Sequence, residues 1–583
     1  MNFDLHLCPE IPSPNATSSS SPSGWGPRVG RVSIRRQDGT SLEIKTPGLI
    51  TSTSRGIVPH LARDTTRATK AIAWVHIPFE SFLDRIPPVP TLQQGPHPLH
   101  KYLGFLPSQH IISTSLRDPF DGREMPANGH EFVNAYCLRG VRKVTAPEWR
   151  SYVQACEPDI VVALSDIPFT PGPHSQKRMT KSIERSSAWL VEILRPIPAN
   201  EDPPSETKSD SSVSPHLNVF VHMAGGVEPA ARNTFARSLL EPLYEKEAEA
   251  VKPLKCLDEG VAGYTFDLVP LHRSLSTPST TVIPSTTSPA KVKKAMAVLT
   301  PHTNPSLSLP VTTEKLIPLM QTSLQPLPRN KPRVANSISG PHEILQLIKG
   351  VGIDLFDGHW AQRAADWGIA LDFVFPPPSA NTDEATEGTR AQQGLGHNLY
   401  DSRYAYDFTA FADSFRPASS NSTSLSTDDD RLVCPCIACS PSTPTTSIQH
   451  SKLDLTSPPP NPNPVSPPFT RAYVHHLLHT HEMSAHALLA SHNLSILDAF
   501  FASIRTFLSQ NVGVPDSVSG AVSVSDRFSR EVERFSEVYD SSMTVFEEAR
   551  RSWAEVEMAR GKGRMARERE KQVDDTLGTA VEL

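Results

Sequence analysis

The sequence predicts an α/β protein built as a (β/α)8, TIM-type barrel. From residue 145 onward, helical and strand patterns alternate, which is typical of a mostly parallel sheet with helical crossovers. No Gly-x-Gly-x-x-Gly opens a first helix and no Walker A sequence occurs, so the competing architecture, an open nucleotide-binding sheet, is disfavoured. Asp166 and Asp357 each end a predicted strand, and a barrel gathers such strand ends at its active face. The alternative for these acids, a helix N-cap or a turn, is equally common.

The elements of this barrel can be predicted one after another along the chain. Residues 28–36 and 41–51 flank the turn Asp38–Gly39, which predicts a hairpin. Residues 146–156 carry apolar side chains at helical spacing, and residues 158–166 (PDIVVALSD) form a β-branched run that predicts a strand buried on both faces. The remaining predicted elements are strands within 71–79, 217–226, 263–271, 331–340, 353–358 and 368–376, helices at 176–194, 230–250 and 341–350, and a final apolar helical stripe over 528–553.

Segments rich in Ser, Thr and Pro interrupt the predicted domain. Many of the 56 prolines lie in these segments, which have too few apolar residues to offset the entropy lost on ordering. We therefore expect a flexible N-terminus over 1–27, a barrel domain over 28–515, and a C-terminal helix with a charged tail over 516–583. Within the barrel domain, disordered insertions are expected at about 198–215, 273–330, 378–430 and 440–469.

Composition and charge narrow the class of protein. The formal net charge of the 583 residues is -6, so any contact with nucleic acid must come from a local basic patch. The first residues have neither a signal-peptide nor a transit-peptide pattern, and no run approaches 18 apolar residues, so we expect no membrane span. The scattered cysteines Cys8, Cys137, Cys156 and Cys256 are typical of a reducing compartment. A soluble intracellular protein is the expectation.

The strongest local signal is a cysteine knuckle with C-x-C-x-x-C spacing, formed by Cys434, Cys436 and Cys439. A structural Zn²⁺ takes four soft or borderline ligands, and Cys₃His is a common set. Because the chain has only 7 cysteines, the knuckle favours a metal over three free thiols or a disulfide with one cysteine left over. We therefore predict an inserted zinc-binding subdomain. Six histidines could supply the fourth ligand, and spacing alone does not choose among them: His475, His476, His479, His481, His486 and His492.

Three stretches together resemble the tRNA-guanine transglycosylase family: GIDLFDG (352–358), CPCIAC (434–439) and TRAYVHHLLHTHEMSAHALLASHNL (470–494). Further similarity at TPGLI, PDIVVALSD, KPRVANSISGPHEIL and IRTFL extends the resemblance over the whole predicted barrel domain. The resemblance implies a zinc-bearing (β/α)8 barrel that exchanges a guanine in a tRNA anticodon for a deazaguanine base. For a eukaryotic member it implies a heterodimer of a catalytic subunit and an accessory paralogue. That heterodimer inserts queuine at the wobble position of tRNAs with GUN anticodons.

The resemblance also implies the metal ligands. It assigns one structural Zn²⁺ to Cys434, Cys436, Cys439 and His492, and leaves the other five histidines as solvated or packing residues of a helix. The gap of 52 residues between Cys439 and His492 exceeds the family's usual spacing. The excess corresponds to the proline-rich loop 440–469, which a site can tolerate because closure entropy grows only slowly with loop length. Since the zinc region of the family lies near the subunit interface, we expect the metal to shape a dimerising surface.

The same resemblance separates a catalytic from an accessory member. Asp357 stands where catalytic members have a nucleophilic aspartate, and Asp166 matches a base-binding aspartate. Four other catalytic elements are missing, and a base site without its polar partners loses specificity. The substitutions are residues 112–122 for an Asp-Ser-Gly-Gly-Phe-Gln loop, Ala224 for a base-reading glutamine, residues 263–272 for a Gly-Gly-Leu-Ala-Val-Gly-Glu loop, and residues 359–368 for a Pro-Thr-Arg segment.

These features imply a non-catalytic subunit of the queuine tRNA-ribosyltransferase heterodimer, with a catalytic subunit and tRNA as partners. We expect it in the cytoplasm, with a peripheral position on the mitochondrial outer surface as the alternative. Two other functions stay open at this point. One is a competent tRNA-guanine transglycosylase that uses Asp357 as nucleophile and Asp166 to orient the base. The other is a zinc-stabilised scaffold without a role in tRNA modification.

Overall fold

The computed structural model describes residues 1–7, 24–36, 38–168, 174–197, 217–276, 309–378, 392–417, 431–441, 468–510 and 523–553. The chain forms two compact units. Unit 1 comprises Met1–Trp360, Val374–Ala380 and Leu497–Ser536. Unit 2 comprises Ala361–Phe373, Asn381–Ile496 and Glu537–Leu583.

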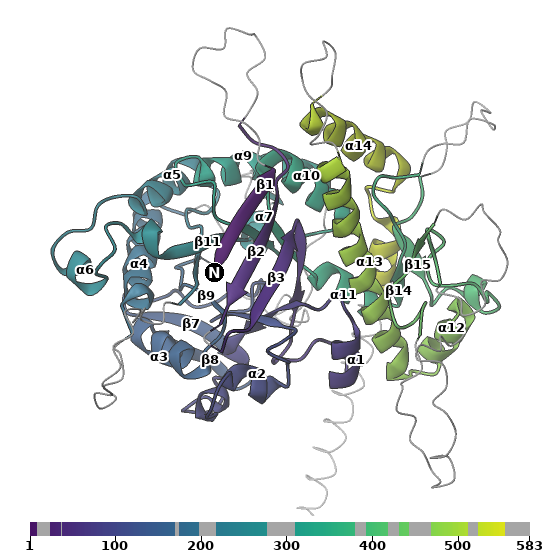
Figure 1. Cartoon of the computed structure of the whole chain (residues 1–583), viewed down its shortest axis with the longest axis horizontal. Helices are drawn as coiled ribbons and strands as arrows, with labels where there is room; N and C mark the ends of the chain where they lie inside the picture. Colours follow the sequence, from purple (N-terminus) through teal and green to yellow (C-terminus); the bar gives the residue numbers. More distant parts are fainter. Residues whose placement is uncertain are drawn as a thin grey trace, which may run out of the picture. The chain divides into compact units, whose positions relative to one another are not determined.

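Unit 1 is built on a closed barrel of parallel strands that follow one another around the barrel in sequence order (Figure 1). Pairing of the last strand with the first closes the barrel, and the predicted (β/α)8 fold is thereby confirmed. The barrel strands are β4 (Gly48–Ser52), β5 (Trp74–Pro78), β6 (Ile111–Ser115), β9 (Ile160–Val162), β10 (Val219–His222), β11 (Val261–Asp267), β12 (Arg333–Asn336) and β13 (Leu355–Asp357).

Helices connect these strands and surround the barrel (Figure 1). In α4, the side chains of Met179, Ser186 and Trp189 are buried at helical spacing, and the hydroxyl of Ser175 caps the first turn by accepting from the Arg178 N–H. The helices are α1 (Arg63–Ala68), α2 (Pro98–Leu103), α3 (Ala146–Cys156), α4 (Gln176–Leu194), α5 (Pro229–Ser238), α6 (Glu245–Ala250), α7 (Leu268–Ser276), α9 (Leu309–Leu324) and α10 (Pro341–Val351), with 3-10 turns η1 (Phe79–Phe82), η2 (Val89–Leu92) and η3 (Leu257–Gly260).

A separate antiparallel sheet covers the N-terminal end of the barrel. It has the order β1 (Asn2–Leu7), β2 (Val29–Arg35), β3 (Ser41–Thr46). Val32 and Ile34 of β2 share one core cluster with Trp74, Ile111 and Ile160, the first residues of three barrel strands. Full burial of such a side chain stabilises the fold by about 1.5–3 kcal/mol. The strands terminate at the opposite end of the barrel, where Asp357 ends β13 and Asp166 follows β9. A hairpin of β7 (Phe132–Cys137) and β8 (Gly140–Thr145) lies between β6 and α3 in the sequence.

Unit 2 contains two short two-stranded sheets and several helical elements. β14 (Ile369–Leu371) pairs antiparallel with β15 (Gly396–Asn398), and β16 (Phe415–Arg416) pairs in parallel with β17 (Leu432–Val433). The 3-10 turn η4 (Ser402–Tyr404), α12 (Arg471–His479) and a helical segment over 544–553 also lie in unit 2. Three further helices have residues in both units: α11 (His359–Asp366), α13 (Met483–Gln510) and α14 (Val524–Val538).

The structure differs from the sequence-based expectation in several segments. β1 lies in the N-terminus expected to be flexible, where it pairs with β2. The end of α7 and all of α9 lie inside the expected 273–330 insertion, and β15, η4 and β16 lie inside 378–430. α9 buries Leu316, Leu319 and Met320; these few apolar positions are outweighed by the Ser/Thr/Pro-rich residues before them. The insertion at 198–215, residues 442–467 of the loop 440–469, Cys8 and the tail 554–583 lie outside the described residues.

The predicted C-terminal helix is divided in two. α14 ends at Val538, and a second helical segment occupies 544–553. Between them Asp540 accepts hydrogen bonds from the Ser542 N–H and the Thr544 N–H, both at 2.8 Å. These side chain-to-backbone bonds compete with the helical pattern, so a continuous apolar stripe over 528–553 does not produce one helix.

Among the described helices, α13 alone is long and apolar enough to cross a membrane by length and composition. In its most apolar window, however, 67% of the residues are buried inside the structure. This is the pattern of a core helix, and it gives no support to a membrane span.

Candidate metal centre and barrel carboxylates

The three knuckle cysteines lie on a tight turn in unit 2 directly after β17. The Cys434 N–H donates to the Arg416 carbonyl at 2.9 Å, which continues the pairing of β16 and β17. Ser440 closes the turn, because its N–H donates to the Cys436 carbonyl at 2.9 Å and its Oγ donates to the Cys434 carbonyl at 2.7 Å. The C-x-C-x-x-C spacing thereby brings three sulfur atoms to one point.

His492 reaches this point from α13. Its Nε2 lies 2.9 Å from the Leu371 carbonyl, which can only accept a hydrogen bond, so Nε2 carries the proton and Nδ1 faces the sulfurs. Asn493 fixes the same turn of helix against β14. Its Oδ1 accepts from the Leu371 N–H at 2.9 Å and its Nδ2 donates to the Ile369 carbonyl at 2.9 Å. The His-Asn pair therefore sets both the tautomer and the direction of the ring.

The resulting cluster fits a four-coordinate metal ion. Nδ1 of His492 lies 3.7 Å, 3.4 Å and 3.6 Å from the sulfurs of Cys434, Cys436 and Cys439. A tetrahedron with ordinary Zn–S and Zn–N bond lengths has S–N edges of about 3.6 Å. All four donor atoms lie within 4.8 Å of one another, and all four residues are buried.

The electrostatics of the thiols point the same way. Hydrogen bonds from the neighbouring thiols of Cys436 and Cys439 lower the pKa of Cys434, whereas burial raises the pKa of Cys436. The thiolate of Cys434 is therefore stabilised in this buried space, whereas that of Cys436 is disfavoured. A divalent cation would reverse that balance, because it neutralises the negative charge and binds the deprotonated form.

The other five histidines lie away from the cluster. His475 and His479 bond to the carbonyls of Leu399 and Tyr400, and His486 lies 3.0 Å from the Ala365 carbonyl. The side chains of His476 and His481 are exposed. Hence the fourth position of the cluster belongs to His492 alone among the six candidates.

A second group in unit 2, Asp372, His397 and Asp413, is close enough to hold a metal, but a cation of the chain already occupies it. The Arg471 guanidinium lies 3.0 Å from Nε2 of His397 and 2.9 Å from Asp413. Asp372 accepts hydrogen bonds from the Asp413 N–H at 2.7 Å and the Ser414 N–H at 3.1 Å. We interpret this group as an ion-pair network that anchors the start of α12.

In unit 1, Asp166 lies just beyond β9, where its side chain is fully buried. Arg178 donates to both carboxylate oxygens at 2.8 Å, and Arg185 donates to one of them at 2.9 Å. Nδ2 of Asn128 donates to the other oxygen at 2.7 Å. Four donors therefore surround the carboxylate that the resemblance assigns to base binding, and the chain itself supplies all of them. The sequence signal for this was available but missed: Arg178 and Arg185 are seven residues apart and share one face of α4.

Asp357, at the end of β13, is equally enclosed, with 1% of its surface exposed. One oxygen accepts from the N–H groups of Ser337 and Ile338, and the other from the His359 N–H at 2.8 Å. Burial raises the pKa of Asp357 to about 7, although these backbone hydrogen bonds oppose the shift. A carboxylate in this state is a poor nucleophile, because it is buried, three N–H groups already donate to its oxygens, and it is partly protonated near neutral pH.

The loop that replaces the missing catalytic motif lies next to Asp357. The ring of Phe120 stacks on that of His359, with centroids 3.9 Å apart and an interplanar angle of 11°. Ser337 Oγ donates to the Pro119 carbonyl at 2.8 Å, and the Arg273 guanidinium donates to the Gly122 carbonyl. The loop is thus fixed against the residues that surround Asp357. Ala224, which stands in place of the base-reading glutamine, is 5% exposed and offers no polar side-chain group.

A closed eight-stranded parallel barrel with a buried Cys₃His cluster defines the class of protein that the sequence motifs resemble. The family model described as "Queuine tRNA-ribosyltransferase" matches residues 24–248 and 305–512. This match covers well over half of the chain, so the chain belongs to the queuine tRNA-ribosyltransferase family.

Curated relatives carry a more specific name, "Queuine tRNA-ribosyltransferase accessory subunit 2". The Xenopus tropicalis protein of that name is 25% identical over 501 residues, which are 83% of this chain and 94% of the relative. The Schizosaccharomyces pombe protein is 25% identical over 529 residues, 90% of this chain and 84% of the relative. The Drosophila persimilis protein is 24% identical over 493 residues, which are 84% of this chain and 87% of the relative.

Proposed function

We propose that this chain is the non-catalytic accessory subunit of a heterodimeric queuine tRNA-ribosyltransferase. The enzyme would exchange guanine for queuine at the wobble position of tRNAs with GUN anticodons. The observation that carries the proposal is the state of Asp166, whose carboxylate is fully engaged by Arg178, Arg185 and Asn128. A base could bind there only by displacing the two arginines that pair with this buried carboxylate, which is strongly unfavourable.

The enclosed state of Asp357 supports the same proposal. A nucleophile must approach within bonding distance of the ribose. Both carboxylate oxygens of Asp357, however, accept hydrogen bonds from backbone N–H groups. The two alternative functions are not favoured. A competent enzyme needs these carboxylates free, and a scaffold unrelated to tRNA would not be expected to match the family model over most of its length.

The metal is proposed to be one Zn²⁺, held by Cys434, Cys436, Cys439 and His492. Three thiolates and one imidazole form a closed structural site with no open position for a reacting water, so the ion would act by holding the knuckle to α13. Zinc is favoured over a harder ion such as Mg²⁺ because sulfur donors select soft or borderline metals.

The surface near this knuckle is suited to a protein partner. Tyr406 and Phe408 are 87% and 73% exposed, and Tyr473 is 44% exposed. Their segments are tied together, since the Ala472 N–H donates to the Asp407 carbonyl at 2.7 Å. Phe469, whose ring stacks on Tyr473 with centroids 5.5 Å apart, donates its N–H to the Ala438 carbonyl of the knuckle. Exposed aromatic side chains in one patch are typical of protein interfaces, and we propose that the catalytic subunit binds here.

The decisive experiment measures guanine exchange into tRNA by the purified chain alone, by the catalytic subunit alone and by their mixture. We expect negligible exchange by this chain alone and clear exchange by the mixture. Exchange by this chain without a partner would contradict the proposal. A cytoplasmic location of the heterodimer belongs to the same proposal, and fractionation against mitochondrial outer-membrane markers tests it.

A further inference from the structure

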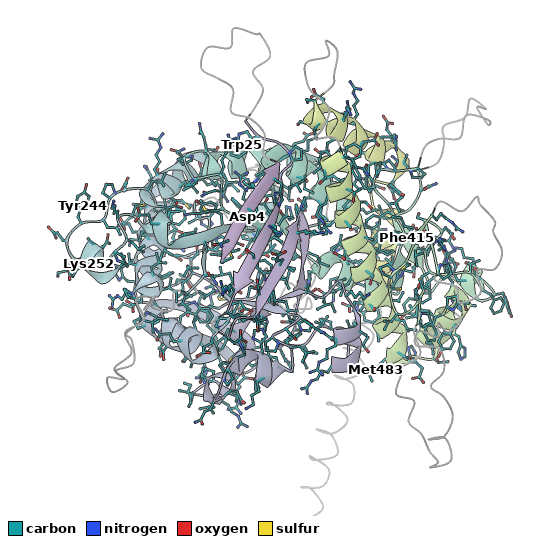
Figure 2. The ribbon with its side chains drawn as sticks, viewed as in Figure 1. Asp4, Trp25, Tyr244, Lys252, Phe415 and Met483 are labelled. Carbon is teal, nitrogen blue, oxygen red and sulfur yellow. The ribbon has the colours of Figure 1, made fainter. Side chains whose placement is uncertain are left out.

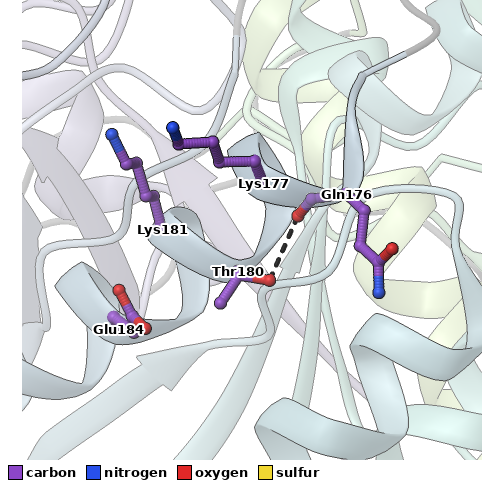
Figure 3. Close-up of a pocket in the computed structure, with 5 residues that line it drawn as sticks. All are labelled: Gln176, Lys177, Thr180, Lys181 and Glu184. Atoms are coloured by element: carbon purple, nitrogen blue, oxygen red, sulfur yellow. Dashed lines mark hydrogen bonds between the residues drawn. The ribbon is translucent and has the colours of Figure 1, made fainter.

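The outer side of α4 carries a pair of lysines that the barrel does not use. Lys177 and Lys181 are exposed and four residues apart, so they lie above one another on the helix. Figure 3 shows the two side chains extending side by side from the same side of α4. With Gln176, Thr180 and Glu184 they line an open pocket of about 370 Å³. In the part of the chain that the structure describes, neither lysine has an ion-pair partner.

The inner side of the same helix adds positive charge. Arg178 and Arg185 together bring two cations to the single carboxylate of Asp166, and their side chains remain 24% and 16% exposed. The first half of α4 therefore has four cations, and among the described residues of this helix and its ion pairs the opposing acids are Asp166 and Glu184. This is a local basic surface on a chain whose formal net charge is -6.

This arrangement is unfavourable for the helix itself. The first turn of α4 contains no acidic residue, although acids are what the positive end of a helix dipole prefers. Like charges four residues apart also repel each other by a few tenths of a kcal/mol. A bound anion would relieve both effects, because its charge complements the lysines and the helix dipole together.

The position of Lys177 and Lys181 on the barrel indicates which kind of anion would bind there. α4 begins after β9, so its first turns lie at the strand-terminal end of the barrel, where Asp166 is held. Lysines are compact point charges that contact phosphates without reading a base. Two of them on adjacent turns suit successive phosphates of one strand. We propose that Lys177 and Lys181 contact the sugar-phosphate backbone of the tRNA bound by the heterodimer. This inference rests on the proposed accessory function and adds to it the surface that carries the RNA.

The test uses the full-length chain assembled with its catalytic subunit and a tRNA transcript with a GUN anticodon. The affinity is measured at several salt concentrations for the wild type and for the double variant Lys177→Ala/Lys181→Ala. We expect the variant to bind about 5- to 20-fold more weakly near physiological salt. The slope of log affinity against log salt should fall in magnitude by about 1.4–1.8, the value for two lost phosphate contacts.

Two controls separate charge from other effects. Lys177→Arg/Lys181→Arg keeps both charges and should bind within about twofold of the wild type. Lys246→Ala/Lys252→Ala removes the same charge from the exposed segment around α6, where Figure 2 labels Lys252 beside Tyr244, and should leave both affinity and slope unchanged.

Unchanged affinity and slope in Lys177→Ala/Lys181→Ala would overturn the inference. So would unchanged RNA binding with weaker association of the two subunits, since the pair would then contact protein. Failure of the proposed function has a different signature. In that case, adding the wild-type chain to the catalytic subunit would change neither tRNA binding nor guanine exchange.

Discussion

Arg178 donates to both carboxylate oxygens of Asp166 at 2.8 Å, so a guanidinium of the chain takes the position where the family resemblance implies a base. The planar fork of arginine presents two N–H groups to a carboxylate, as the edge of a guanine could. Arg185 and Asn128 also donate to this carboxylate, so the charge of Asp166 is neutralised and both of its oxygens accept hydrogen bonds from the chain. The proposed non-catalytic role is therefore supported by the arginine that bonds to Asp166 as well as by the motifs that are missing.

The first prediction concerns this ion pair. Arg178→Ala should lower the free energy of unfolding by about 3 kcal/mol, because it leaves a fully buried carboxylate with fewer partners. In the double variant Asp166→Ala/Arg178→Ala the loss should be clearly smaller than the sum of the two single losses. Denaturant unfolding of the purified chain measures all three. Lys177→Ala, on the exposed side of the same helix, is the matched control, and additive losses would refute the coupling.

The second prediction concerns the metal. The purified chain should contain one zinc ion per molecule, and Cys436→Ala should reduce this to near zero with a lower melting temperature, since metal binding contributes to folding. Elemental analysis and a thermal scan provide the two readouts. Cys256→Ala, outside the cluster, should keep its zinc. Full zinc content in Cys436→Ala would count against the four-ligand site.

The third prediction follows from the raised pKa of Asp357. The unfolded chain releases this proton near pH 4, whereas the folded chain holds it until about pH 7. Between these values the folded state binds more protons than the unfolded state. The contribution of Asp357 to the free energy of unfolding is therefore fully present below pH 4 and is lost as the pH rises through 7. Asp357→Asn should remove that contribution and flatten the stability profile by up to about 1.4 kcal/mol per pH unit in this window. Unfolding of both proteins at pH 5, 6, 7 and 8 measures it. The exposed Asp64→Asn should retain the wild-type profile.

The fourth prediction concerns the aromatic patch in unit 2. Phe408→Ala and Tyr473→Ala should each weaken association with the catalytic subunit by about 1–3 kcal/mol, as for large aromatics at interfaces. Tyr244→Ala removes an aromatic side chain that is 71% exposed in unit 1 and should leave association unchanged. Titration calorimetry with the catalytic subunit gives the three dissociation constants. Equal dissociation constants for all three variants would show that the aromatic patch is not the binding surface.

The elements with the strongest local sequence patterns are the ones that the sequence predicts correctly. α4 begins at Gln176 and ends at Leu194 as predicted, because a long amphipathic run with a serine cap leaves few alternatives. β1 and α9 were missed for the opposite reason. β1 gains its stability from pairing with β2, and α9 has only a few apolar residues beside a Ser/Thr/Pro-rich tract, so their order depends on contacts distant in the sequence.

By itself, the sequence determined the barrel and the three knuckle cysteines, and the resemblance added His492 and the family, since these depend on periodicity, spacing and motif. Only the tertiary structure decided the state of the site. The Leu371 carbonyl orients His492 toward the sulfurs, two arginines of α4 enclose Asp166, and three backbone N–H groups enclose Asp357. Each of these is a contact between segments brought together by packing, and neither residue type nor local spacing specifies such a contact in advance. Asp357 is therefore present as a residue, while burial and three backbone N–H groups lower the reactivity that a nucleophile needs.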